Sequence, residues 1–284
     1  MKLRSLLFVP GDRPERMEKA LSTGADALIL DLEDSVSRER KADARKAIDE
    51  FLRRPTRPVT LFVRINPLDS GFADADLDAV VAAAPDGIVL PKSEGGSTVA
   101  ELARRLTALG NETARILPIG TETAAAVFGM GTYGGSSPRL CGVTWGAEDL
   151  PAAIGATSAR EEDGSYTPPY QLARSLTLFG AAAAGVAPIE TVFPAFKDLD
   201  GLARYTARAA RDGFTGMMAI HPTQVAVINA AFTPSEEAVA HARAVIAAFA
   251  ANPGAGALSL DGKMIDAPHL KSAQRVLRQV GEQP

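Results

Sequence analysis

Eight short apolar runs, each followed by a helical pattern, are the feature of this sequence that most constrains its fold. The clearest run is Ala27–Ser35, ALILDLEDS, in which unbroken apolar residues lead into three acidic ones. A continuous apolar run of this kind is typical of a strand that is buried on both faces. Strands that alternate with helices usually form a parallel sheet. The eight runs span residues 5–10, 27–35, 59–65, 87–91, 115–121, 140–145, 186–193 and 216–220.

Eight such units predict a (β/α)8 TIM barrel with a C-terminal helical extension, and a doubly wound open sheet is the alternative. The chain has 284 residues, and α/β barrels routinely reach about 250 residues as one domain. We expect a catalytic barrel over residues 1–232. The remainder, residues 233–284, contains a long helix, a glycine-rich connector and a last helix, which we expect to contact a neighbouring subunit.

The charge, the apolar runs and the cysteine content of the chain limit the kinds of partner and compartment that we expect. A net charge of −4 argues against a nucleic-acid partner, which would require a basic face, although a local cationic pocket is still allowed. No run approaches the roughly 20 apolar residues of a membrane span. The single cysteine, Cys141, cannot form an internal disulfide, which fits a reducing compartment. We therefore expect a cytoplasmic protein with neither a nucleic-acid nor a membrane partner.

Polar side chains stand at or just after the ends of these runs. In a barrel the carboxyl ends of the strands meet at one rim, which carries the active site. Carboxylates gathered there repel one another unless cations lie among them, and Mg²⁺ typically takes one or two carboxylates. Any single acid there can equally be a helix cap or an ion-pair partner. The residues expected at the rim are Asp31, Glu33, Asp34, Arg64, Lys92, Glu122, Asp149, Glu190 and His221.

The sequence does not predict a dinucleotide, nucleotide-phosphate or zinc site. Gly129–Gly134 matches GxGxxG, but it follows a helical run and opens none, so it does not predict a dinucleotide site. The sequence has no Walker A motif and no His/Cys cluster with zinc spacing. Cys141 lies in a predicted strand, where a core position is expected.

Together the strand-end motifs resemble the citrate lyase β-subunit-like proteins of the HpcH/HpaI aldolase/citrate lyase family. The resemblance covers the chain from Arg4 to about Ala273. It implies a barrel enzyme, usually a homotrimer or hexamer, that uses Mg²⁺ to cleave or form carbon–carbon bonds in hydroxyacyl-CoA thioesters. The motifs are LFVPG, ALILDLEDS, FVRIN, IVLPKSE, TET, WGAEDL, GFTGMMAIHPTQ and LDGKMID, in this order.

The resemblance also implies roles for single residues. Glu122 of TET and Asp149 of WGAEDL match the metal ligands, and Arg64 of FVRIN matches a catalytic residue that contacts the thioester or oxoacid oxygens. Asp266 of LDGKMID resembles a catalytic acid donated by a neighbouring subunit; the alternative is that it only caps the following helix. Glu190 stands where the family has Asp, so the family's contacts there do not transfer unchanged. The substrate-binding positions implied are Phe8, Arg13, Lys19, Arg64, Glu122, Ile189 and Glu190.

The chemistry required is consistent with these residue types. Cleaving a β-hydroxyacyl thioester such as malyl-CoA or citramalyl-CoA to acetyl-CoA and a 2-oxoacid needs a cation for the developing charge and an acid to protonate the enolate. Arg64 can hold an oxyanion. Three alternatives remain open: the β subunit of a citrate lyase complex acting on citryl-acyl carrier protein, a thioesterase or synthase outcome from the same site, and a non-catalytic CoA-ester-binding barrel.

Overall fold

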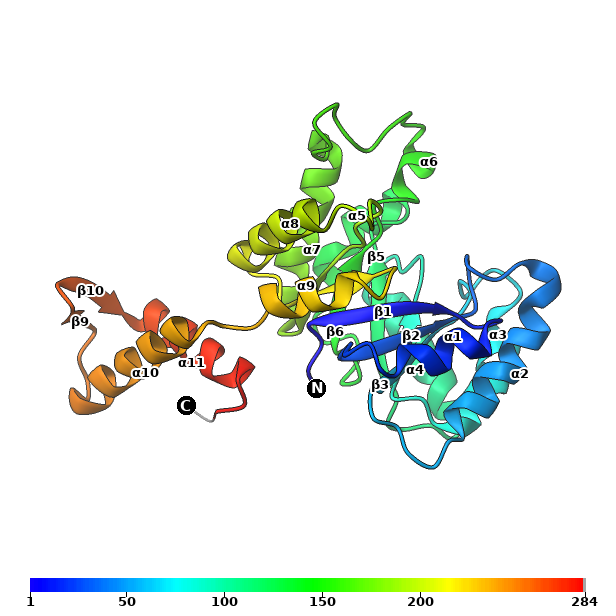
Figure 1. Cartoon of the computed structure of the whole chain (residues 1–284), viewed down its shortest axis with the longest axis horizontal. Coiled ribbons are helices and arrows are strands. Elements are labelled where there is room, and N and C mark those ends of the chain that lie inside the picture. The colour runs from blue at the N-terminus through cyan, green and yellow to red at the C-terminus, as the bar shows by residue number, and fades with distance from the viewer. Residues whose placement is uncertain (283–284) are drawn as a thin grey trace. The chain divides into compact units, whose positions relative to one another are not determined.

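The computed structural model describes residues 1–282. Figure 1 shows the whole chain, coloured from the N-terminus to the C-terminus. Eight parallel strands form a closed barrel in chain order, with β8 paired to β1. The barrel predicted from the alternating runs is thereby confirmed, and the open-sheet alternative is excluded. No helix of the described residues is both long and apolar enough to cross a membrane. The strands are β1 (Ser5–Pro10), β2 (Ala27–Asp31), β3 (Thr60–Arg64), β4 (Gly87–Leu90), β5 (Arg115–Gly120), β6 (Gly142–Trp145), β7 (Ala187–Glu190) and β8 (Gly216–Ala219).

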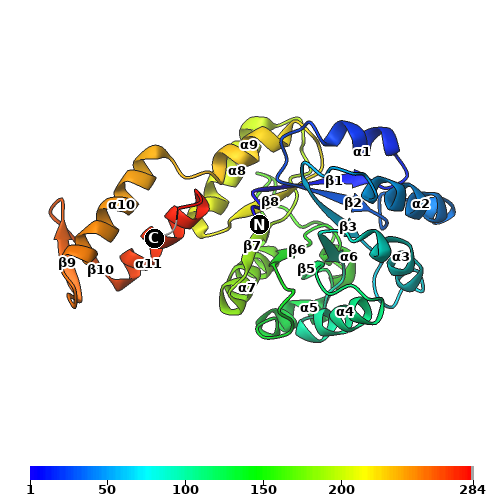
Figure 2. The same ribbon diagram turned by 90° about the horizontal axis from the view of Figure 1, so that it is seen from below.

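Helices connect successive strands and surround the barrel (Figure 2). The segment after β8 forms a helix, α9, that has no counterpart among the predicted elements. Its sequence, QVAVINAA, is apolar on most faces and shows no helical period. The helices and 3₁₀ turns are α1 (Pro14–Ala20), η1 (Arg38–Arg40), α2 (Lys41–Leu52), α3 (Ala73–Val80), η2 (Val81–Ala83), α4 (Gly96–Ala108), α5 (Ala124–Gly129), η3 (Met130–Thr132), α6 (Leu150–Ile154), α7 (Pro168–Ala184), α8 (Leu199–Asp212) and α9 (Gln224–Ala231).

Alternate strand residues fill the interior of the barrel. Ile29 and Phe62 are fully buried there in one apolar cluster, against which Phe8 packs. Because side chains alternate across a strand, Asp31 and Arg64 face the same side as Ile29 and Phe62, two residues nearer the carboxyl ends. The strand register also places Asp31 opposite Arg64. The fold therefore brings these two charged side chains together at the inner rim.

The chain divides into two compact units, one of residues 3–229 and one formed mainly by the chain from Ala230 onward. In the second unit an antiparallel hairpin joins two helices, and Val245 packs with Ile265 and Leu277 in its core. Its elements are α10 (Glu236–Ala251), β9 (Ala257–Leu260), β10 (Lys263–Asp266) and α11 (Ala267–Gln279).

Candidate functional site

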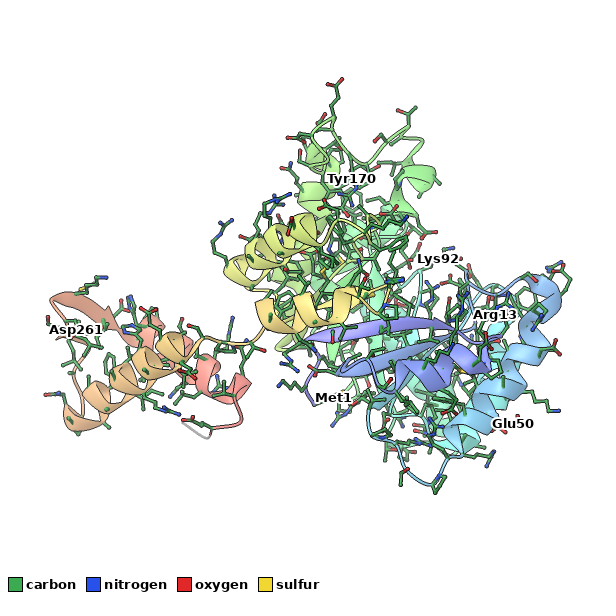
Figure 3. The ribbon with its side chains drawn as sticks, viewed as in Figure 1. Met1, Arg13, Glu50, Lys92, Tyr170 and Asp261 are labelled. Carbon is green, nitrogen blue, oxygen red and sulfur yellow. The ribbon has the colours of Figure 1, made fainter. Side chains whose placement is uncertain are left out.

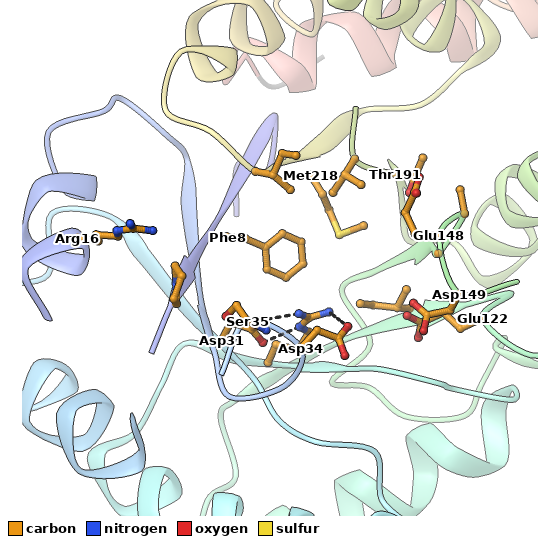
Figure 4. Close-up of a pocket in the computed structure, with 17 residues that line it drawn as sticks. Phe8, Arg16, Asp31, Asp34, Ser35, Glu122, Glu148, Asp149, Thr191 and Met218 are labelled. Atoms are coloured by element: carbon orange, nitrogen blue, oxygen red, sulfur yellow. Dashed lines mark hydrogen bonds and ion pairs between the residues drawn. The ribbon is translucent and has the colours of Figure 1, made fainter. Parts of the chain in front are cut away.

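A cavity of about 440 Å³ opens at the carboxyl ends of the barrel strands (Figure 4). Residues from the ends of β1, β2, β3, β5 and β8, and from the loops after β6 and β7, line it. In Figure 4 the ring of Phe8 lies between Arg16 on one side and Glu122 with Asp149 on the other. The cavity thus has a cationic edge and an acidic edge with an aromatic ring between them.

Arg64 is the most firmly held charged group in the cavity. Its Nε and Nη2 donate to the two carboxylate oxygens of Asp31, both at 2.7 Å. Nη1 lies 2.9 Å from Glu33 Oε2, and the guanidinium stands 4.7 Å from the centroid of the Phe8 ring. Burial disfavours the charged form of Asp31, but Arg64 and two backbone N–H donors, among them that of Ser35, still hold the pKa of this carboxyl below its usual range. The guanidinium is therefore a fixed, permanently charged fork.

Glu122 follows β5 and is almost fully buried. Burial raises the pKa of its carboxyl to about 8, with further contributions from Glu33 and Asp149, although the backbone N–H of Lys92 donates to Oε2 at 2.5 Å. Gly146 makes room for this side chain, because a Cβ there would lie 2.3 Å from Glu122 Cγ. Thr121 and Lys92 both have positive φ, 66° and 49°. Such strain in non-glycine residues persists only where the surroundings enforce it, and it clusters at functional sites.

The carboxylates of Glu122 and Asp149 fit a magnesium ion. Both line the acidic edge of the cavity, and their charges interact. A buried carboxyl with a raised pKa is short of neighbouring positive charge, which a divalent cation supplies. Residues 1–282 contain no group of three or more His, Cys, Asp or Glu side chains placed to hold a metal. Two carboxylates suffice for Mg²⁺, which keeps water or substrate oxygens as its other ligands.

Six of the residues predicted for the site or the rim line this cavity: Phe8, Asp31, Asp34, Arg64, Glu122 and Asp149. The other predicted residues are not among those that line it. Arg13 precedes α1 and lies 3.6 Å from an Asp12 carboxylate oxygen, and Lys19 is exposed on α1. Ile189 is buried in the apolar barrel interior. Of the other rim candidates, His221 bonds to Thr223 and stacks on Phe196.

Glu190 is not a lining residue of the cavity, contrary to the substrate contact expected for it. Because Ile189 faces the barrel interior, Glu190 faces the surrounding helices. It is fully buried, and its carboxylate accepts hydrogen bonds from Trp145 Nε1 at 2.5 Å, Arg174 Nε at 2.7 Å and the Thr191 backbone N–H at 3.0 Å. The next residue, Thr191, lines the cavity instead.

Asp266 belongs to the C-terminal unit, where it is the N-cap residue of α11. One of its carboxylate oxygens lies 2.6 Å from His269 Nδ1. Its hydrogen bond to His269 is the largest of the effects that lower the pKa of this carboxyl. Asp266 thus occupies the helix-start position named as the alternative to a catalytic role.

The lining residues that the sequence analysis did not single out include Arg16, Glu148 and Thr191. Two of them left a signal. Arg16 lies three residues after Arg13 on the same helical pattern, and Glu148 belongs to the WGAEDL motif. Thr191 is a neutral residue next to a charged one, and nothing in the sequence distinguishes it.

Comparison with known proteins gives a consistent family. The HpcH/HpaI aldolase/citrate lyase family model matches residues 4–222. The chain is 39% identical to the citrate lyase subunit beta-like protein of Mycobacterium tuberculosis over 97% of this chain and 95% of that one. It is 34% identical to the mitochondrial citramalyl-CoA lyase of Rattus norvegicus over 96% of this chain and 85% of the relative. The crystal structure of CitE from M. tuberculosis, in complex with magnesium, acetoacetate and coenzyme A, superposes with a TM-score of 0.81 at 36% identity, covering 98% of each chain.

Proposed function

The chain belongs to the HpcH/HpaI aldolase/citrate lyase family, and on that basis we propose that it is a magnesium-dependent carbon–carbon lyase. Its substrate is a β-hydroxyacyl-CoA thioester such as malyl-CoA or citramalyl-CoA, which it cleaves to acetyl-CoA and a 2-oxoacid or forms in the reverse direction. The observation that carries the proposal is the cavity in which the fixed fork of Arg64 shares one rim with the carboxylates of Glu122 and Asp149. The relative named citramalyl-CoA lyase and the magnesium and coenzyme A complex support it.

Cleavage breaks the bond between the α carbon of the thioester and the hydroxyl-bearing carbon. The hydroxyl gives its proton to solvent water and becomes the carbonyl of the 2-oxoacid, and the electrons of the broken carbon–carbon bond pass to the thioester as an enolate. Glu122 and Asp149 would hold Mg²⁺, which supplies Lewis-acid stabilisation of negative charge on oxygen. Arg64 donates its N–H groups to a developing oxyanion, and its bonds to Asp31 orient it beforehand, so little reorganisation accompanies the step. An acid must then protonate the enolate carbon, and Asp266 of a neighbouring subunit is our candidate.

Further parts of the proposal concern partners. The basic residues Arg13, Arg16 and Lys19 on and before α1 would meet the phosphates of coenzyme A, and Arg16 already lines the cavity. A homotrimer or hexamer would bring Asp266 of one copy to the rim of the next. A cytoplasmic location accords with the single, unpaired Cys141.

The test is to incubate purified protein and Mg²⁺ with a panel of hydroxyacyl-CoA esters and to identify the products by mass spectrometry. We expect acetyl-CoA together with a 2-oxoacid from at least one ester. Free CoA together with an intact hydroxyacid would indicate a thioesterase instead. Cleavage of citryl-acyl carrier protein alone would identify a citrate lyase β subunit, and binding without any turnover would identify a non-catalytic barrel.

A further inference from the structure

Lys92 lies among the acidic side chains of the cavity rim, and no step described above uses it. It is the second residue after β4, separated from the end of the strand by Pro91, and is labelled in Figure 3. Its backbone N–H donates to Glu122 Oε2, and its Nζ lies 3.7 Å from Asp149 Oδ1 and 3.9 Å from Glu33 Oε1. One residue therefore contacts both proposed metal ligands, Glu122 through its backbone and Asp149 through its ammonium.

The backbone of Lys92 is held in this position against a conformational cost. A φ of 49° places a non-glycine residue in the left-handed region, which residues with a Cβ rarely adopt. The next residue secures the turn: the Ser93 N–H donates to the Ile119 carbonyl, and the hydroxyl of buried Tyr133 donates to the Ser93 carbonyl. The conformation directs the Lys92 N–H at the carboxylate of Glu122. That contact does not depend on which side chain residue 92 carries.

The ammonium of Lys92 lies near a buried carboxylate, that of Glu33, which has too few partners. Both carboxylate oxygens of Glu33 are buried without a hydrogen-bond partner among the described residues, although Arg64 and Lys92 lie within ion-pair distance. The Lys92 ammonium lies within ion-pair distance of the carboxylates of Glu33 and Asp149. It therefore places a positive charge beside the position where Glu122 and Asp149 would bind a cation.

This inference rests on the proposed function. We propose that Lys92 is a positioning residue for the two metal-ligating carboxylates. We also propose that its ammonium is a counter-ion to these carboxylates and competes with the bound metal. Without metal, the ammonium limits the repulsion among Glu33, Glu122 and Asp149. When Mg²⁺ binds, it enters a site that already contains a unit positive charge, and like charges a few ångströms apart weaken binding. Lys92 thereby stabilises the metal-free protein and sets the affinity for the metal at a moderate value.

The test compares Lys92→Met with the wild type in metal-free and Mg²⁺-saturated form. Methionine keeps the backbone N–H and most of the side-chain volume but removes the charge. We expect calorimetry to show Mg²⁺ binding about three- to tenfold tighter. We also expect the metal-free Tm to fall by roughly 3–6 °C and the Mg²⁺-induced rise in Tm to grow correspondingly. Lys92→Arg keeps the charge and should stay within about twofold of wild-type affinity.

Lys46→Met is the matched control, because Lys46 is exposed on α2 with only a 4.0 Å ion pair to Glu50. Lys46→Met should leave the Mg²⁺ affinity, the metal-free Tm and the Mg²⁺-induced rise in Tm unchanged. Mg²⁺ affinity that is unchanged or weaker in Lys92→Met overturns the inference, and if that variant does not fold, Lys92→Gln gives the same comparison. Failure of the proposed function looks different: the wild type would not bind Mg²⁺, or Glu122→Ala would bind it as well as the wild type.

Discussion

The side chain of Arg64 is constrained on several sides at once. Asp31 takes two of its N–H groups, Glu33 lies beside a third nitrogen, and the Phe8 ring stands next to the guanidinium. A planar, five-donor fork can satisfy these partners and still present an N–H to an oxyanion. A lysine ammonium cannot hold the same two-point contact with Asp31.

Arg64→Lys should therefore lower kcat by roughly 10²–10³, the usual loss for one transition-state donor. Steady-state release of acetyl-CoA measures the rate, and calorimetric Mg²⁺ binding by the same variant serves as the control, since Glu122 and Asp149 are unchanged. A rate near that of the wild type would mean that Arg64 is only a structural partner of Asp31.

Glu122→Ala should remove most of the Mg²⁺ affinity and leave the fold intact. The side chain is a proposed metal ligand. Its removal takes away a buried carboxylate, which is unfavourable in the metal-free protein, and leaves no cavity in the apolar core. Calorimetry measures the affinity, and circular dichroism checks the fold. The exposed Glu50→Ala is the control and should bind Mg²⁺ like the wild type. Equal binding by the two variants would remove Glu122 from the metal site.

Glu33 makes the stability of the metal-free protein depend on pH. Burial raises the pKa of this carboxyl from 4.5 to about 7, Asp34 and Asp31 add to the rise, and Arg64 and Lys92 oppose it. Between those values the folded protein binds more protons at this site than the unfolded chain does. The contribution of Glu33 to the free energy of unfolding therefore falls as the pH rises from about 4.5 to 7 and is constant above that.

Glu33→Gln removes this titration and mimics the protonated form. Relative to the wild type, the variant should gain up to about 3 kcal/mol in the free energy of unfolding at pH 8 and almost nothing at pH 4. Urea denaturation of both metal-free proteins at the two pH values measures the difference. A difference independent of pH would show that Glu33 titrates at its ordinary value.

At the scale of the elements, β6, β7 and α7 are joined behind the cavity by Glu190. Trp145 at the end of β6 and Arg174 on α7 both donate to its carboxylate, and Arg174 also binds Asp212 at the end of α8. Tyr166 packs edge-on against Trp145 at a centroid distance of 5.1 Å. This network fixes the carboxyl ends of two strands, and the loops after them carry Asp149 and Thr191 into the cavity.

Breaking this buried pair should be costly. Arg174→Met leaves the charge of Glu190 buried without its cation, and we expect a loss of about 3–5 kcal/mol in the free energy of unfolding, measured by urea denaturation. The double variant Arg174→Met with Glu190→Gln should regain part of the lost free energy of unfolding, because residue 190 then carries no unpaired buried charge. Arg211→Met, an exposed arginine next to Asp212, should cost less than about 0.5 kcal/mol. A similarly small effect in Arg174→Met would show that the pair does not hold the strand ends.

At the scale of the whole molecule, the proposal gives the C-terminal unit a part in the reaction of a neighbouring subunit. The unit has its own apolar core, and Asp266 stands at the start of its last helix. We expect Asp266 to act on a neighbouring subunit in a cyclic oligomer, where contacts of one surface with a different one close into a ring.

Coexpression of Glu122→Ala and Asp266→Ala, each of which we expect to be inactive alone, tests this arrangement. Mixed oligomers should regain part of the activity, since some interfaces then join an intact metal site to an intact Asp266. Mixed assembly is verified by differential affinity tags. Mixed oligomers that stay inactive would contradict the shared site and would leave Asp266 as the partner of His269 at the start of α11.

The sequence by itself determined the barrel and the carboxyl-end position of its charged residues. Continuous apolar runs and helical periods are local patterns, and the closed order of eight strands follows from their repetition. Arg64, Glu122 and Asp149 were found for the same reason: each stands at or just beyond a strand end, and all strand ends of a parallel barrel meet at one rim.

Only the tertiary structure decided which way the neighbouring side chains face. Glu190 ends a strand but faces the helices because Ile189 occupies the interior position, and only the position of the strand in the barrel sets that parity. On α1, Arg16 lines the cavity and Lys19 does not, because the way in which α1 packs on the barrel determines which of its side chains face the cavity. Lys92 acquires its contact with Glu122 through a left-handed backbone that its sequence does not signal. Periodicity is a property of the chain, whereas the direction in which a side chain faces depends on what packs against it.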